Sequence, residues 1–171
     1  VTGANGGLGR EFVEQALAKG AAKVYATARR PQEWHDARIV PLALDVTDPA
    51  SIRAAVAQAP DVTVLINNAG IAVESDTLLA LPDEGIRNVM ETNFFGPVAL
   101  TKAFAPVLAV SGTSAVLNIH SALSWIALTG AYSASKAALW SATNSFRVEL
   151  APQGTHVTGV HVAYIDTAMA E

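Results

Sequence analysis

Tyr132 and Lys136 are the residues of this sequence whose types and spacing best suit acid–base chemistry. They are four residues apart at the start of an alanine-rich helical pattern, so their side chains would share one helix face. Moving a tyrosine pKa from about 10 towards 7 requires roughly 4 kcal/mol of differential stabilisation of the phenolate. A nearby ammonium can supply much of that stabilisation. Ser121, which ends the preceding apolar run, could polarise a substrate oxygen.

The same segment allows two other interpretations. Ser133 and Lys136 satisfy the Ser-x-x-Lys motif of acyl-enzyme hydrolases, which also need Ser-Asp-Asn and Lys-Thr-Gly elements. Ser75-Asp76-Thr77 matches the first element poorly, the second is absent, and no Gly-x-Ser-x-Gly elbow occurs. A tyrosine and a lysine on one helix can also be ordinary surface or packing residues. The surrounding elements therefore have to separate these alternatives.

A glycine-rich turn opens the chain, with the sequence Thr2-Gly3-Ala4-Asn5-Gly6-Gly7-Leu8-Gly9. A strand end precedes it and a helical pattern follows it, as in dinucleotide-binding folds. In such a turn Gly3 permits the tight exit from the strand, Gly7 lets the backbone approach a pyrophosphate, and Gly9 lets the helix pack closely. Free N–H groups at the helix start would hold the phosphates. The pattern favours nucleotide binding over a glycine loop without a ligand, and it is not a P-loop.

The end of the second predicted strand indicates which dinucleotide binds. An NAD site usually has an acidic residue there, but Ala28 takes that position and Arg29-Arg30 follows. The guanidinium of Arg29 suits a 2′-phosphate, so NADP(H) is favoured over NAD(H). The alternative is a solvated basic pair on a loop. Asp45, at the end of the third strand, is expected to accept from the adenine amino group, because Asp48 is the better cap for the next helix.

Short apolar runs alternate with helical patterns along the chain, which is the order of a parallel sheet with crossover helices. Strands are expected at 23–27, 39–44, 62–66, 115–119 and 157–162, and helices at 8–17, 49–59, 83–109 and 132–150. Gly20 should end the first helix, Asp48-Pro49 should begin the second, and the third should be interrupted near Gly96-Pro97. We predict an α/β fold: one Rossmann-type domain over residues 1–171, a doubly wound parallel sheet with helices on both faces in three layers.

Composition narrows the function classes. Hydrophobic residues make up 51% and charged residues 15%, which suits a sheet covered on both faces and hints at a surface hidden by a partner subunit. The formal charge of -4 does not favour nucleic acid, and the absence of cysteine excludes thiolate chemistry. The four histidines show no ligand spacing, so no metal site is expected. Lys102 interrupts the longest apolar stretch, so no membrane span is expected. A cytoplasmic location is expected.

The combined segments resemble the classical short-chain dehydrogenase/reductases, in the order of that family and over nearly the whole chain. The matching pieces are Thr2-Gly3, Gly7-Leu8-Gly9, Asp45-Val46, Asn67-Asn68-Ala69-Gly70, Asn93-Phe94-Phe95-Gly96, Ser121 and Tyr132-Ser-Ala-Ser-Lys136. The resemblance implies an NADP(H)-dependent oxidoreductase that interconverts a small carbonyl compound and its alcohol by hydride transfer. It also implies a homodimer or homotetramer formed through helices such as 132–150. A non-catalytic NADP-binding sensor or scaffold is the alternative.

The resemblance assigns four catalytic roles. Tyr132 would be the general acid in reduction and the base in oxidation, and Lys136 would lower its pKa and bond the nicotinamide ribose. Ser121 would orient and polarise the carbonyl, with Ser124 as a second candidate for this role. Asn93 would hold the water that links Lys136 to solvent.

The resemblance also assigns the cofactor contacts. Asn68, Ala69 and Gly70 would line the adenine-side ribose and the floor of the site, while Asn67 would tie its strand to the neighbouring strand. Ile165 and Thr167 would meet the carboxamide and the pyrophosphate. The implied cofactor set is Gly3, Asn5, Gly6, Gly7, Leu8, Gly9, Arg29, Asp45, Val46, Asn68, Ala69, Gly70, Tyr132, Lys136, Ile165 and Thr167.

Two features depart from the family pattern. Val162-Ala163 stands where the family usually has Pro-Gly, which weakens the roles of Ile165 and Thr167. Ser121 and Tyr132 are eleven apart, slightly closer than usual, which indicates a shortened loop or missing residues near 128–130. Both ends of the chain are abrupt, so we expect it to be the middle of a longer protein. His120 could line the active site next to Ser121, but in a strand with period two we expect it to point to the opposite face.

Overall fold

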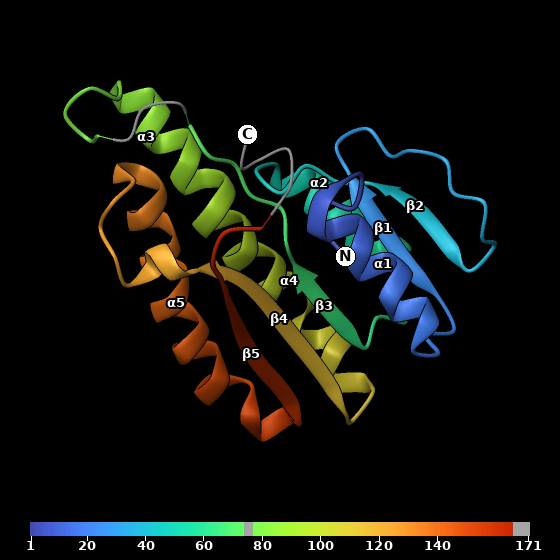
Figure 1. Ribbon diagram of the computed structural model, residues 1–171. Coiled ribbons are helices and arrows are strands. Elements are labelled where there is room, and N and C mark those ends of the chain that lie inside the picture. The colour runs from blue at the N-terminus through green and yellow to red at the C-terminus, as the bar shows by residue number, and fades with distance from the viewer. Residues whose placement is uncertain (74–76, 166–171) are drawn as a thin grey trace.

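The computed structural model describes residues 1–73 and 77–165 of the chain (Figure 1). Its named strands are β1 (Val24–Ala28), β2 (Ile39–Ala43), β3 (Val64–Asn67), β4 (Ser114–Ser121) and β5 (Thr155–Val162). β1 pairs with β2, and β3, β4 and β5 pair in that order, all in parallel. Residues 1–4 join the two groups, because the Thr2 N–H donates to Ile66 (3.0 Å) and the Ala4 N–H donates to Thr27 (3.0 Å). The two groups of strands are therefore parts of one parallel sheet, as predicted.

Helices cover both faces of this sheet. The α-helices are α1 (Gly7–Ala18), α2 (Pro49–Gln58), α3 (Asp83–Met90), α4 (Gly96–Val110) and α5 (Gly130–Glu149). Side chains alternate across a strand. In β1, Val24 and Ala26 pack in the cluster under α1, whereas Tyr25 packs against the larger cluster under α2, α4 and α5. The predicted three-layer arrangement is confirmed.

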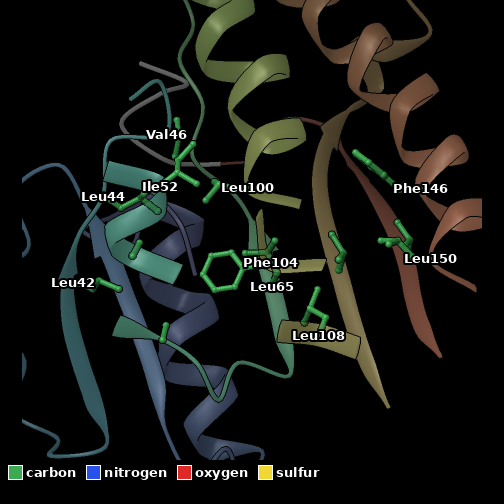
Figure 2. Packing of buried hydrophobic residues seen from close by; sticks show 14 residues of the cluster. Leu42, Leu44, Val46, Ile52, Leu65, Leu100, Phe104, Leu108, Phe146 and Leu150 are labelled. Atoms are coloured by element: carbon green, nitrogen blue, oxygen red, sulfur yellow. The ribbon is translucent and has the colours of Figure 1, made fainter. Parts of the chain in front are cut away.

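The larger cluster is the main core of the fold. Leu65 of β3 lies among Leu100, Phe104 and Leu108 of α4, as Figure 2 shows, with Ile52 of α2 beside them. Each fully buried leucine or phenylalanine contributes about 1.5–3 kcal/mol relative to an exposed one. This core packs helices α2, α4 and α5 against the strands, and so it helps to fix the positions of the carboxyl ends of the strands.

The predicted boundaries of the first two helices are confirmed. The Asp48 carboxylate caps α2 by accepting from the N–H groups of Ala50 (2.8 Å) and Ser51 (3.2 Å). Gly20 follows the end of α1 with φ +93°, a conformation that favours glycine.

The predicted interruption of the third helix near Gly96-Pro97 is confirmed. It is a π-helical turn over Glu91–Phe95, just before these residues. Pro97 stands in the first turn of α4, where its missing N–H is not needed, so it marks the start of a helix. Such a turn inserts an extra residue into a helix and is frequent at functional sites.

The run from α3 through α4 is also long and apolar enough to cross a membrane, by length and composition alone. This differs from the expectation that Lys102 would interrupt the apolar stretch. Of its most apolar window 39% is buried inside the protein, and Leu100 and Leu108 belong to the core. A core helix that packs on a sheet meets the same criteria, and this run packs on β3 and β4.

Candidate active site

A cleft of about 1170 Å³ opens at the carboxyl ends of the parallel strands. It lies where residues 1–4 and β3 run side by side and lead to helices on opposite faces, the usual binding crevice of such sheets. Thirteen predicted residues line it: Gly3, Asn5, Gly6, Gly7, Leu8, Arg29, Asp45, Val46, Asn68, Ala69, Gly70, Tyr132 and Lys136. His120 also lines the cleft, so the expectation that it would point away is wrong. The further lining residues are Thr27, Ala28, Arg30, Leu44, Ile71, Ala72, Val73, Asn88, Thr92, Ile119 and Val162. Several of these directly adjoin predicted residues, which is the signal that could have found them.

The glycine turn is built from close backbone approaches. Gly3 and Gly7 have φ values of +65° and +51°, in the left-handed region that favours glycine. A Cβ at Gly9 would overlap the carbonyl oxygen of Gly3 and lie 2.7 Å from the side-chain nitrogen of Asn68. The start of α1 therefore sits directly against the turn, with its first N–H groups at the cleft.

Thr2 and Asn68 hold this turn against the end of β3. The Thr2 hydroxyl accepts from the N–H groups of Asn68 and Ala69, both at 2.9 Å. The Asn68 amide donates in return to the carbonyls of Thr2 (2.9 Å) and Gly3 (3.3 Å). Asn68 thus lines the cleft but its amide fixes the turn. Sequence reasoning missed the role of Thr2, although its place before Gly3 was visible.

The predicted role of Asn67, to tie its strand to the neighbouring strand, is confirmed. Its side-chain nitrogen donates to Asn118 of β4 (2.8 Å) and to Thr101 of α4 (3.2 Å). All three side chains are buried. The bonds tie β3 to β4 and to the helix that covers them.

The segment after β1 is tied to the glycine turn. The Asn5 amide donates to the carbonyl of Arg30 (2.8 Å), which places Arg29 and Arg30 along one wall of the cleft. The Asp45 carboxylate accepts from the N–H (2.9 Å) and hydroxyl (2.7 Å) of Thr47. These bonds lower the pKa of Asp45, and the charge of Arg29 acts in the same direction.

Lys136 is a buried cation at the inner end of the cleft. Its side chain is 5% exposed, and its ammonium donates to the carbonyl of Ile119 (2.9 Å). Burial lowers the pKa of Lys136 from 10.5 to about 8. A Cβ at Gly70 would lie 3.6 Å from the ammonium nitrogen, so glycine there keeps the space beside it.

Tyr132 lies beside Lys136, whose nitrogen is 5.6 Å from the centre of the phenol ring. Burial raises the pKa of Tyr132, and a hydrogen bond with Ser121 acts in the opposite direction. Lys136 is not among the causes that shift this pKa in the folded chain, so its expected role in lowering the pKa of Tyr132, together with an oxidised nicotinamide, stays a prediction. The ammonium is directed to the carbonyl of Ile119, and desolvation of the phenol has the larger effect.

Asn93 lies in the π-helical turn and is fully buried. Its amide donates to the Ile71 carbonyl (2.8 Å) and to the Ser135 hydroxyl (3.1 Å), and its oxygen accepts from the Ile71 N–H (2.8 Å). The side chain thus anchors the cleft wall at residues 70–71 next to Lys136. Its expected role towards a water stays a prediction.

The serines after β4 divide their roles. Ser121 is bonded to Tyr132 and also accepts from the Leu123 N–H (3.1 Å). Ser124 turns back to accept from the Ser121 N–H (3.4 Å), which closes a 3-10 turn over Ala122–Ser124. Of the two serines, Ser121 is the one whose hydrogen bonding acts on the pKa of Tyr132. Ser133 donates to the Ile126 carbonyl (3.1 Å), so its hydroxyl fastens the loop and is not poised as a nucleophile.

The whole chain, residues 1–171, matches the family model of the short chain dehydrogenases. This chain belongs to the short-chain dehydrogenase family. The order of motifs, the parallel sheet and the Tyr132–Lys136 pair all agree with that membership.

Curated relatives and solved structures give the same picture. The chain is 35% identical to the NADPH-dependent 1-acyldihydroxyacetone phosphate reductase of Schizosaccharomyces pombe, with 98% of this chain and 59% of that protein covered. A short chain dehydrogenase from Burkholderia cenocepacia in complex with NADP superposes with a TM-score of 0.94 at 38% identity, over 99% of this chain and 73% of that one. An NADPH-bound carbonyl reductase from chicken fatty liver gives 0.90 at 31%, over 100% and 81%. The chain thus spans about three fifths of the length of its curated relative.

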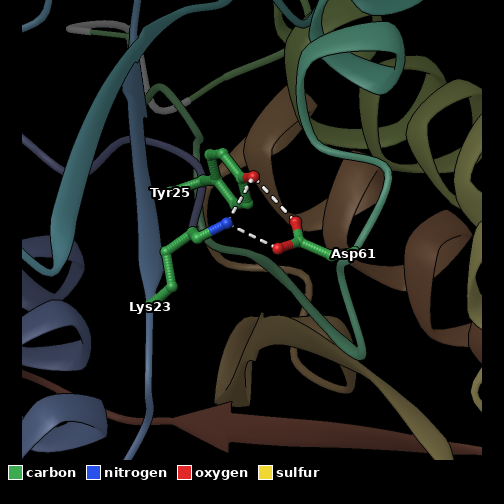
Figure 3. Close-up of polar contacts among 3 residues, drawn as sticks. All are labelled: Lys23, Tyr25 and Asp61. Carbon is green, nitrogen blue, oxygen red and sulfur yellow. Dashed lines mark hydrogen bonds and ion pairs between the residues drawn. The ribbon is translucent and has the colours of Figure 1, made fainter.

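This short-chain dehydrogenase contains a second tyrosine–lysine pair, at the opposite end of the sheet. The Tyr25 hydroxyl donates to Asp61 (2.7 Å), and Lys23 contacts both groups, as Figure 3 shows. Burial raises the pKa of Tyr25, and the Asp61 carboxylate raises it further. The trio joins the start of β1 to the segment before β3, so it is a structural contact.

Three further predicted residues support the cleft without being among its lining residues: Gly9, Asn93 and Ser121. Ile165 follows the end of β5 and is not among the lining residues of the part of the chain that the structure describes. Thr167 lies outside the described residues. Over residues 1–73 and 77–165, no three histidine or acidic side chains gather in a way that could hold a metal.

The buried ammonium predicts how stability depends on pH. The pKa of Lys136 falls from 10.5 to about 8 on folding, so between these pH values the unfolded chain holds a proton that the folded chain has released. The free energy of unfolding of wild type therefore rises with pH across this window. Below about pH 8 the full cost of burying the charged ammonium lowers the stability of the folded chain. We expect the unfolding free energy of wild type, relative to Lys136→Met, to increase over the window in urea titrations. Exposed Lys102→Met is the control, and a difference that does not vary with pH would contradict the burial.

Proposed function

We propose that this chain is the cofactor-binding and catalytic part of an NADP(H)-dependent reductase that interconverts a small carbonyl compound and its alcohol. The observation that carries the proposal is the Tyr132–Lys136 pair at one end of the cleft, with Ser121 at the nearby end of β4. The ammonium nitrogen of Lys136 is 5.6 Å from the centre of the Tyr132 ring, and hydrogen bonding with Ser121 acts to lower the pKa of Tyr132. At the other end of the same cleft stand the glycine turn and Arg29.

The residues present fit a dinucleotide phosphate. The close approach at Gly9 and the left-handed Gly7 leave the first N–H groups of α1 facing the cleft, a cradle that a Cβ would fill. Arg29 follows a strand that ends in Ala28 instead of an acid, which suits a 2′-phosphate. Related proteins described as NADPH-dependent or solved with NADP or NADPH support this choice. When bound, NADP(H) supplies or accepts the hydride.

The chain's own residues manage the proton. In reduction the Tyr132 hydroxyl would give its proton to the carbonyl oxygen of the substrate, and solvent would then reprotonate the phenolate. The Ser121 hydroxyl donates to the same oxygen and stabilises the developing charge. The Lys136 ammonium, buried beside the phenol, stabilises the phenolate between turnovers. Oxidation of an alcohol uses the same groups in reverse.

Arg29→Ala should weaken binding of NADPH by about 10- to 100-fold, because one charge-assisted contact to a phosphate contributes about 1.5–3 kcal/mol. Binding of NADH should stay at the wild-type level, since that cofactor has no 2′-phosphate. Quenching of nicotinamide fluorescence measures both constants. Exposed Arg53→Ala on α2 is the matched control. Equal affinities of wild type for NADPH and NADH would contradict the cofactor assignment.

A sensor that binds NADP without chemistry is the second candidate. The observation in its favour is that burial raises the pKa of Tyr132 in the folded chain. Consumption of NADPH with a panel of aldehydes and ketones separates the two, because a sensor would bind the cofactor and turn over nothing. The cytoplasmic location and the homodimeric or homotetrameric state stay predictions, which fractionation and sedimentation would test.

A further inference from the structure

Three aromatic rings form a stacked column behind Ser121. His161 of β5 stands opposite His120 of β4 in the strand register. The His161 ring stacks on Trp125 with centroids 4.0 Å apart at 17°, and on His120 at 4.7 Å and 24°. One face of a ring cannot hold two stacked partners, so Trp125 and His120 lie on opposite faces. The column therefore runs from the fully buried His120 to Trp125, which is 59% exposed.

Hydrogen bonds define the protons of both imidazoles. The Nδ1 atom of His161 lies 3.1 Å from the backbone oxygen of Ser121, and a carbonyl only accepts, so this nitrogen carries the hydrogen. The Thr143 hydroxyl already donates to Leu139 (2.8 Å), so it accepts from Nε2 of His120 (3.1 Å). Burial is the main cause that lowers the pKa of His120 to about 4. The inner ring of the column is therefore a neutral, fixed support.

The column contacts both ends of one short segment. His161 donates to the carbonyl of Ser121 and stacks on Trp125, and the 3-10 turn Ala122–Ser124 lies between these two residues. The turn is itself closed by the bond from the Trp125 N–H to Ala122 (3.1 Å). One imidazole thus fixes the entry and the exit of the turn.

We infer that His161 is a positioning residue, whose bond to the Ser121 carbonyl and stack on Trp125 direct the Ser121 hydroxyl towards Tyr132. The inference rests on the proposed function. Without the donor at His161, the peptide plane after Ser121 loses its outer anchor, and the serine hydroxyl loses its fixed direction. A displacement of about 1 Å at such a group costs about 100-fold in rate.

Two substitutions separate the donor from the ring. His161→Phe keeps an aromatic ring between Trp125 and His120 but has no N–H for Ser121. His161→Asn places an amide nitrogen near the position of Nδ1 but removes the ring. We expect His161→Phe to bind NADPH like wild type and to lose about 10- to 100-fold in kcat. His161→Asn should recover most of this loss, and exposed His156→Phe on the same strand should behave like wild type.

The titration of Tyr132 gives a readout that does not need turnover. The bond with Ser121 lowers the pKa of Tyr132, so misdirection of the serine should move the phenol titration to higher pH in His161→Phe. Carbon NMR of labelled tyrosine measures this shift, and His161→Asn should reverse it. A His161→Phe variant with wild-type titration and wild-type kcat would overturn the inference, as would equal losses in both variants without any shift. Absence of turnover in wild type, with the titration shift present, would remove the proposed function and leave the positioning role standing.

Discussion

Tyr132→Phe is expected to lower kcat for carbonyl reduction by about 10²- to 10⁴-fold, the usual contribution of a positioned general acid. The substitution removes only the hydroxyl, so the buried ring and its contact with Lys136 remain. NADPH binding should therefore stay close to wild type. Following NADPH absorbance with a reactive ketone, together with fluorescence titration of the cofactor, measures both quantities.

Tyr25 offers a matched control for this substitution. Tyr25→Phe removes the bond to Asp61 at the far end of the sheet, which should cost about 1 kcal/mol of stability and leave kcat unchanged. A Tyr132→Phe variant that kept the wild-type rate would exclude the phenol as the proton donor. An equal loss of rate in both variants would indicate an effect through folding.

Gly9→Ala is expected to have the largest effect on the folded state. Its new methyl group would overlap the Gly3 carbonyl, and backbone atoms cannot move aside as a flexible side chain can. We expect a loss of about 3 kcal/mol or more in the free energy of unfolding, at or above the upper end for overpacking, with loss of NADPH binding. Urea denaturation and fluorescence titration measure these two effects.

A substitution at the neighbouring Gly6 tests whether the effect of Gly9→Ala comes from steric overlap or from a general sensitivity of the turn to alanine. A Cβ at Gly6 meets no atom within 4 Å, and its φ of -169° is extended backbone that any residue adopts. Gly6 is the N-cap of α1, where alanine is less favourable than glycine, so Gly6→Ala should cost about 1 kcal/mol, well below Gly9→Ala. Similar stabilities for the two variants would contradict the close approach of α1 to the turn.

Local chemistry explains why much of the fold could be predicted. Short apolar runs that alternate with helical patterns predicted the strands and helices. Asp48-Pro49 predicted the start of α2, because a capping carboxylate and a proline both suit the first positions of a helix. The cleft could be placed because the glycine turn and Tyr132 each adjoin the carboxyl end of a parallel strand, and all such ends meet at one edge.

The remaining features depend on contacts between distant residues, which no local pattern encodes. The amide of Asn93 is committed to Ile71, 22 residues away, and His161 reaches Ser121 across 40 residues. The raised pKa of Tyr132 follows from burial, which only the packed structure determines. The π-helical character of the break near Gly96-Pro97 was not predicted, because the proline signals where a helix starts, not how the hydrogen-bond pattern changes before it.

The bond from Asn5 to the Arg30 carbonyl has a consequence for engineering. It couples the loop that would read the adenosine end of the cofactor to the turn that would cradle its diphosphate, so the two are one mechanical unit. Because the bond is accepted by the backbone carbonyl of residue 30, side-chain substitutions at positions 29–30 would leave it in place, and conversion to the unphosphorylated coenzyme could retain Asn5. A grafted loop whose backbone could not accept this bond would lose its support from the glycine turn.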